Sequence, residues 1–118
     1  AKLAATAEGM NPLEVAMYTA TTAGRVAADM EIAAGKMPQA VGESAAEAAV
    51  RIGETFSISG VKSAELAASA AGNAAEKAAF DAGGTARDAE VAKAVAMGQA
   101  MKRATGSASV TADVAATI

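Results

Sequence analysis

The sequence predicts an all-α protein, an alanine-rich bundle of about four close-packed helices with Gly/Pro hinges. About a third of the 118 residues are alanine, the strongest helix former. Apolar and small residues recur at spacings of three and four, which is the helical period. Glycine or proline follows each such stretch, as expected where a helix ends. At this length, residues 1–118 are expected to form a single helical domain.

The first predicted helix spans residues 11–34. Asn11 is placed to cap it, Pro12 suits its first position, and Glu14 completes a capping box. Gly35 is the expected left-handed residue after its end.

Small residues recur every four positions within this first helix. They are Ala16, Ala20, Gly24 and Ala28. Such a ridge lets a neighbouring backbone come close, so it predicts a tightly packed face and a packing role for Gly24. Met10 and Val15 are placed to form a hydrophobic staple at the start of the helix.

The second predicted helix spans residues 38–56, and two starts remain open. One is Pro38, and the other is Ser44, which forms a capping-box pattern with Glu47. One face is lined by Val41, Ala45, Ala48, Ile52 and Phe56. Residues 57–60, rich in Ser and Gly, end the helix.

The third predicted helix, residues 61–82, is the centre of the bundle. Its seam has alternating spacings of three and four and consists of Val61, Ala64, Ala68, Ala71, Ala75, Ala78 and Ala82. Methyl groups allow a partner helix to approach to about 8 Å. Leu66 and Phe80 project toward the opposite, polar side. They are either single exposed side chains or contacts with a second neighbour.

The fourth predicted helix spans residues 86–105, with Thr85 as its N-cap and Asp88 near its positive end. Its first apolar side is formed by Ala89, Ala92, Ala96, Ala100 and Ala104, and its second by Val91, Ala94, Gly98 and Met101. A helix that is apolar on two sides is buried on two sides, which predicts a neighbour outside the chain.

The two ends of the sequence lie outside the predicted helices. Residues 1–9 are predicted to be an N-terminal arm and residues 107–118 a C-terminal tail. Within the tail, Val110, Val114 and Ile118 share one helical face.

Composition narrows the possible functions. The net charge of −3 argues against nucleic-acid binding through a basic patch. No uncharged apolar run reaches the roughly 18 residues that span a bilayer. Aromatic residues make up only 3% of the chain, so a monomer core is thin and burial against partners would add stability.

Catalytic and cofactor chemistry is not expected. The chain has no His and no Cys, so nucleophile–base pairs and di-iron motifs are absent. The carboxylate pairs Glu43/Glu47 and Glu8/Glu14 are better explained by capping, through Glu47 and Glu14. Six scattered Met residues suit core packing rather than metal ligation. No catalytic, cofactor or metal residues are therefore assigned.

The predicted function is that of a structural subunit that assembles with copies of itself, as in a virion capsid, filament or shell. The alternative is an accessory or linker subunit of a larger complex, membrane-associated or pigment-containing. The expected assembly contacts are Leu66, Phe80, Val91 and Met101.

The expected cellular location rests on the absence of a recognisable signal peptide or membrane-spanning run in the sequence. A virion or the cytoplasm is favoured, and an organelle fits if a transit segment was removed. Ala1 at the start is explained either by loss of an initiator Met or by cleavage of a precursor.

Overall fold

The computed structural model describes residues 11–104, and these form an all-α bundle. The helices are α2 (Pro12–Ala33), α3 (Pro38–Thr55), α4 (Gly60–Asp81) and α5 (Ala86–Ala104). The fold class predicted from the sequence is thus confirmed. The predicted arm at 1–9, the tail at 107–118 and the staple residue Met10 lie outside the described residues.

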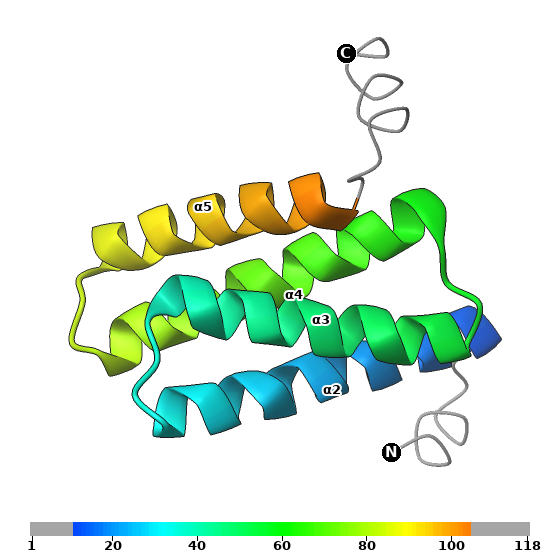
Figure 1. Cartoon of the computed structure of the whole chain (residues 1–118), viewed down its shortest axis with the longest axis horizontal. Coiled ribbons are helices and arrows are strands. Elements are labelled where there is room, and N and C mark those ends of the chain that lie inside the picture. Colours follow the sequence, from blue (N-terminus) through cyan, green and yellow to red (C-terminus); the bar gives the residue numbers. More distant parts are fainter. Residues whose placement is uncertain (1–10, 105–118) are drawn as a thin grey trace, which may run out of the picture.

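Successive helices run in opposite directions, with α3 and α4 as the central pair (Figure 1). Helix α2 packs mainly on α3 and to a smaller extent on α4. Helix α5 packs mainly on α4 and to a smaller extent on α3. The outer helices α2 and α5 therefore lie on opposite sides of the central pair.

The core is divided in the same way into two clusters of buried side chains. The α2-side cluster joins α2, α3 and α4 and contains Ala16, Ala20, Ala28, Val41, Ala45, Ala49, Ile58, Leu66, Ala70, Ala74 and Ala78. The α5-side cluster joins α3, α4 and α5 and contains Ala46, Ala67, Ala71, Ala75, Ala79, Ala89, Ala92, Ala96 and Ala100. Both are built largely of methyl groups, so stability depends on close contact over long helices.

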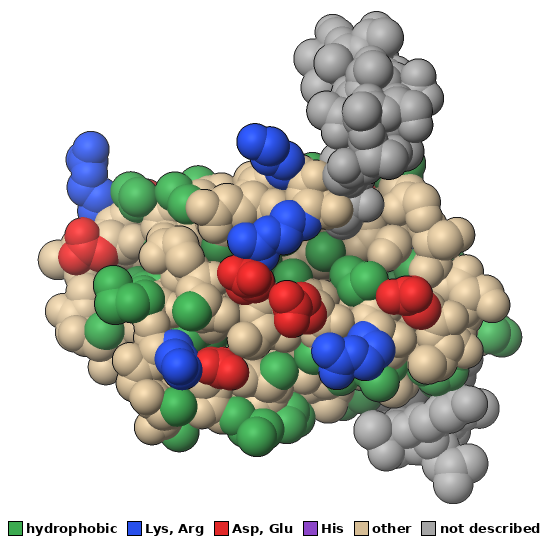
Figure 2. Space-filling view, viewed as in Figure 1, with side chains coloured by type: hydrophobic (Ala, Val, Ile, Leu, Met, Phe, Trp, Pro, Cys, Tyr) green, Lys and Arg blue, Asp and Glu red, His purple; other side chains and the backbone are tan. Residues whose placement is uncertain are grey.

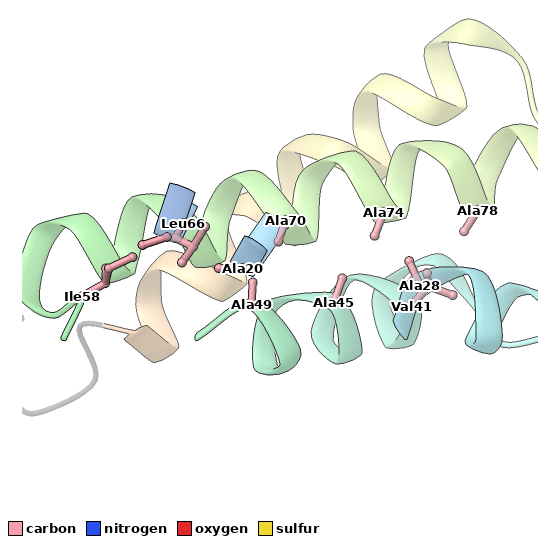
Figure 3. Close-up of a cluster of buried hydrophobic side chains, with 11 residues drawn as sticks. Ala20, Ala28, Val41, Ala45, Ala49, Ile58, Leu66, Ala70, Ala74 and Ala78 are labelled. Atoms are coloured by element: carbon pink, nitrogen blue, oxygen red, sulfur yellow. The ribbon is translucent and has the colours of Figure 1, made fainter. Parts of the chain in front are cut away.

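Helix α4 contributes to both clusters through rows of residues spaced by four. Figure 3 shows one row, Leu66, Ala70, Ala74 and Ala78, pointing toward α3. The predicted seam from Ala64 to Ala78 is buried, as expected, but its ends at Val61 and Ala82 are exposed. Burial extends beyond the seam because α4 is packed against three helices rather than one.

Two glycines mark the places where backbones approach most closely. A Cβ atom on Gly24 would lie 2.9 Å from the carbonyl oxygen of Ala45, and one on Gly42 would lie 2.9 Å from that of Ala71. Neither site has room for a methyl group unless the helices separate. The predicted packing role of Gly24 is confirmed.

Reciprocal hydrogen bonds cap two helices at their N-termini, at the predicted caps Asn11 and Thr85. The Glu14 amide donates to Asn11 Oδ1 (2.8 Å), and the Asn11 amide donates to Glu14 Oε1 (3.4 Å). Thr85 and Asp88 form the same pair at the start of α5. Helix α3 begins at Pro38, so Ser44 lies in its interior and is not the cap.

Three helices end in the same C-terminal motif, with a left-handed residue directly after the C-cap. That residue is Gly35 after α2 and Gly83 after α4, but Ser57 (φ 64°) after α3. In each case the next amide donates to a carbonyl five residues earlier, as Ile58 does to Gly53 (3.0 Å).

Candidate functional site

Leu66 is part of the core, so the prediction that it contacts a partner is wrong. Its side chain is 2% exposed and belongs to the α2-side cluster together with Ile58. It also packs against Gly53, where a Cβ would lie 3.0 Å from Leu66 Cδ2. The helical projection placed Leu66 on the polar side of its helix, but in the structure that side faces the cluster shared by α2, α3 and α4.

The other three expected contacts lie on the surface. Phe80 is 51% exposed, Val91 is 56% exposed and Met101 is 40% exposed. Phe80 is near the end of α4, whereas Val91 and Met101 are both on α5. Their role in assembly stays a prediction.

Val91 and Met101 belong to a continuous apolar strip along α5. This α5 outer face consists of Val91, Ala94, Val95, Gly98 and Met101, all of them exposed. It lies roughly opposite the buried alanines of the same helix, since the two sets differ by about half a turn. The sequence indicated this second apolar side, although Val95 was not recognised as part of it.

Gly98 occupies a distinctive position on the α5 outer face. A Cβ built on Gly98 has no heavy atom within 4 Å, whereas those on Gly24, Gly42, Gly53 and Gly72 all meet neighbouring atoms. Within the described helices, Gly98 is the interior glycine that no close contact in this chain explains.

A second surface feature is a groove between α3 and α5, with α4 as its floor. This α3–α5 groove has a volume of about 360 Å³. Its apolar lining is formed by Ala46, Val50, Ala67, Ala71, Ala96 and Ala100, and its polar lining by Gln39, Glu43, Glu47, Arg51, Glu54, Gln99 and Arg103. The groove was not predicted, because it depends on how far α3 and α5 diverge.

Charged side chains of both signs surround the groove. Figure 2 shows red and blue side chains gathered in the middle of this face, with green apolar surface between them. Arg103 on α5 reaches Glu43 on α3, with Nη1 and Oε2 3.1 Å apart. Both side chains are about half exposed, so this ion pair is solvated and contributes little to stability.

Three of the four carboxylates considered for catalysis have a structural position in the described residues. Glu14 caps α2, Glu43 pairs with Arg103, and Glu47 lines the groove wall rather than capping α3. Glu8 lies outside the described residues. Residues 11–104 contain no group of three acidic side chains placed to hold a metal ion.

Neither a membrane-spanning helix nor a known relative indicates a function for the described residues. Within residues 11–104, no helix is both long and apolar enough to cross a membrane. Comparisons with protein-family models, curated proteins and solved structures found nothing that matches this chain.

Proposed function

We propose that this chain is a non-enzymatic structural subunit that associates with copies of itself through the α5 outer face. The face is apolar from Val91 to Met101, and its side chains remain exposed in the single chain. A contiguous exposed apolar face is typical of contact sites between proteins.

Gly98 is the observation that carries the proposal. A glycine in the middle of a helix costs about 1 kcal/mol relative to alanine. Gly24 and Gly42 offset that cost by allowing close contact with a neighbouring helix, but a Cβ on Gly98 would meet no heavy atom within 4 Å among residues 11–104. It also sits in the middle of the α5 outer face, where a helix from outside could approach its backbone closely.

The arrangement of side chains suits an antiparallel pair of α5 helices. If two copies meet around Ala96, Val91 of one copy lies level with Met101 of the other. Ala94 then lies level with Gly98, so the small residues meet on either side of the two-fold axis. Such a contact is self-complementary, which is the property of a two-fold interface.

The test is the mass of the full chain in solution, measured by sedimentation equilibrium across a range of concentrations. We expect a concentration-dependent oligomer that Val91→Asp together with Val95→Asp weakens. The matched control is Val26→Asp, because Val26 on α2 is exposed to a similar degree as Val91. The control should associate as the unchanged chain does.

Two results would overturn the proposal. One is a chain that stays monomeric at every concentration, which is the behaviour expected of an accessory subunit that needs a different partner. The other is equal weakening by the α5 and α2 variants, which would show non-specific apolar association. A scan of acidic residues tests the non-enzymatic role: no single substitution should abolish biological activity while fold and assembly stay intact.

A further inference from the structure

We propose that Met97 is a redox-sensitive contact between α4 and α5, and that oxidation of its thioether to the sulfoxide loosens the packing of these two helices. The site is the space that the absent side chain of Gly72 leaves on α4, called here the Gly72 notch. The notch lies between two helices of one chain and is separate from the α5 outer face. The inference therefore does not depend on the proposed self-association.

The side chain of Met97 lies directly over the backbone of α4 at Gly72. A Cβ atom on Gly72 would lie 2.5 Å from Met97 Cγ and 3.0 Å from Met97 Sδ. The same atom would lie 3.2 Å from Lys93 Cγ, so the aliphatic stem of Lys93 forms another wall of the notch. Gly72 is buried within α4, and its missing methyl group makes room for Met97. Met97 therefore takes part in the packing between α4 and α5.

Met97 is also accessible to small oxidants in solution, since it is 37% exposed. Met30 and Met37 are far more exposed, at 69% and 70%, so their oxidation removes little packing. Met17 packs against the α2-side cluster and is less exposed than Met97. Met97 thus combines a packed position with access from water.

The modifying reaction transfers one oxygen atom from hydrogen peroxide to Met97 Sδ. A lone pair of the sulfur attacks the peroxide, the O–O bond breaks, and water is released as the sulfur is oxidised to a sulfoxide. A methionine sulfoxide reductase with a pair of thiols reverses the change. The oxygen then leaves as water, and the two thiols are oxidised to a disulfide. The modification can therefore be switched in both directions.

The sulfoxide is poorly suited to the Gly72 notch. Oxidation converts a flexible apolar side chain into a polar one that carries an additional oxygen atom. Backbone N–H groups inside an α-helix already donate to carbonyls of the same helix, so the backbone at Gly72 offers this oxygen no donor. Burying a polar oxygen without a hydrogen bond is costly. Met97 therefore turns toward water and leaves the notch, and α4 and α5 lose the contacts that it made.

Urea denaturation before and after treatment with hydrogen peroxide tests this role of Met97. All chains carry Met17→Leu, because oxidation beside the α2-side cluster would add a separate effect. We expect oxidation to lower the midpoint urea concentration, and Met97→Leu to remove most of this fall. Leucine is close to methionine in volume and has no sulfur to oxidise. Each chain is compared with itself, so a difference in starting stability leaves the result unchanged.

Met101→Leu is the matched control. Met101 is on the same helix and 40% exposed, but it belongs to the α5 outer face. The fall in the midpoint should persist in this variant, and treatment with the reductase should reverse it. If Met101→Leu removes the fall and Met97→Leu retains it, oxidation acts through the α5 outer face. That result overturns the role of the Gly72 notch and leaves the proposed self-association standing.

The amide signal of Gly72 gives a second measurement, which needs no substitution at Met97. In ¹⁵N spectra, this signal should shift after peroxide treatment and return after reduction. Mass spectrometry of peptides gives the extent of oxidation at each methionine. Complete oxidation of Met97 with an unchanged midpoint or an unchanged Gly72 signal would overturn the proposal. So would a Met97 that stays reduced under conditions that oxidise Met101.

Discussion

Leu66 and Phe80 are the two large side chains of the third predicted helix that fell outside its alanine seam, and the structure separates them. Leu66 is packed in the α2-side cluster, whereas Phe80 is half exposed. Both residues lie on the polar side of the predicted helix, so the sequence pattern could not distinguish the buried side chain from the exposed one. Leu66 packs against Gly53 of α3 and lies in a cluster that includes residues of α2.

Truncating these two side chains should therefore have very different effects. Leu66→Ala should lower the free energy of unfolding by about 2–5 kcal/mol, because it leaves a cavity among buried side chains. Phe80→Ala should change it by less than about 0.5 kcal/mol, as for most surface substitutions. Urea denaturation measures both values. A similar loss in both variants would show that Phe80 is buried in the folded chain.

The ion pair between Lys77 and Asp29 predicts a pH dependence. The Lys77 Nζ lies 2.7 Å from Asp29 Oδ1, linking α4 to α2. The hydrogen bond to Asp29, and then its negative charge, raise the pKa of Lys77 above its ordinary value of 10.5. Because the folded-state pKa is the higher one, this contribution is complete below pH 10.5. It is lost as the pH rises through the folded-state pKa.

Denaturation on both sides of pH 10.5 tests this expectation. The free energy of unfolding should fall slightly over the alkaline range, and Lys77→Met should remove that part of the fall. The effect should be small, since both side chains are about half exposed and solvated. Lys62→Met, an exposed lysine on the same helix, is the control. Equal slopes for the two variants would contradict a specific role for the pair.

At the scale of helices, boundaries followed from the sequence more directly than packing did. Asn11, Gly35, Gly83 and Thr85 act through local hydrogen bonds and backbone conformation, so their positions predicted the ends of α2, α4 and α5 closely. The sequence left two possible starts for α3, because Ser44 and Glu47 have the spacing of a capping box although they lie inside the helix. Local patterns cannot distinguish such a copy from a true cap.

The packing of α4 shows where sequence patterns lose information. Alanine is common on every side of this helix, so a row of alanines does not reveal which side faces water. The seam from Ala64 to Ala78 was correct but incomplete, because three neighbours cover α4. The α3–α5 groove was missed for a related reason: it reflects the spacing between two helices, which no local pattern encodes.

The cap of α2 predicts a measurable contribution from Asn11. Asn11→Ala should cost about 1 kcal/mol, because the Glu14 amide loses its hydrogen-bond acceptor. Asn73→Ala, at an exposed site inside α4, is the matched control and should cost nothing or be slightly stabilising. An equal effect at both positions, measured by urea denaturation, would argue against capping by Asn11.

At the end of α3, a single substitution is expected to stabilise the fold. Ser57 has a φ of 64°, in the left-handed region that glycine occupies after α2 and α4. Ser57→Gly should raise the free energy of unfolding by up to about 1 kcal/mol, because glycine adopts this conformation without steric cost. Ser59→Gly, two residues later in an extended conformation, should be destabilising instead. Thermal denaturation of both variants distinguishes relief of strain from a general effect of glycine.

At the scale of the whole molecule, the chain uses glycine in two ways. Gly42 brings the central helix α3 close to both α4 and α5, since a Cβ there would lie 2.9 Å from the Ala71 carbonyl oxygen and 3.1 Å from the Ala96 Cβ. Gly98 is exposed, and a Cβ there would meet no heavy atom within 4 Å in the part of the chain that the structure describes. One glycine therefore serves the fold, and the proposed function assigns the other to association.

Replacing each glycine with alanine separates these two roles. Gly42→Ala should destabilise the fold by about 1–3 kcal/mol, because two contacting backbones must move apart. Gly98→Ala should stabilise the single chain by up to about 1 kcal/mol through its better helix propensity. The same Gly98→Ala change should weaken self-association, because the added methyl group keeps a second α5 from approaching. Urea denaturation of dilute protein measures the first effect and sedimentation equilibrium the second. If Gly98→Ala raises stability and leaves association unchanged, the close contact at Gly98 does not form, and the α5 outer face loses its main support as the assembly surface.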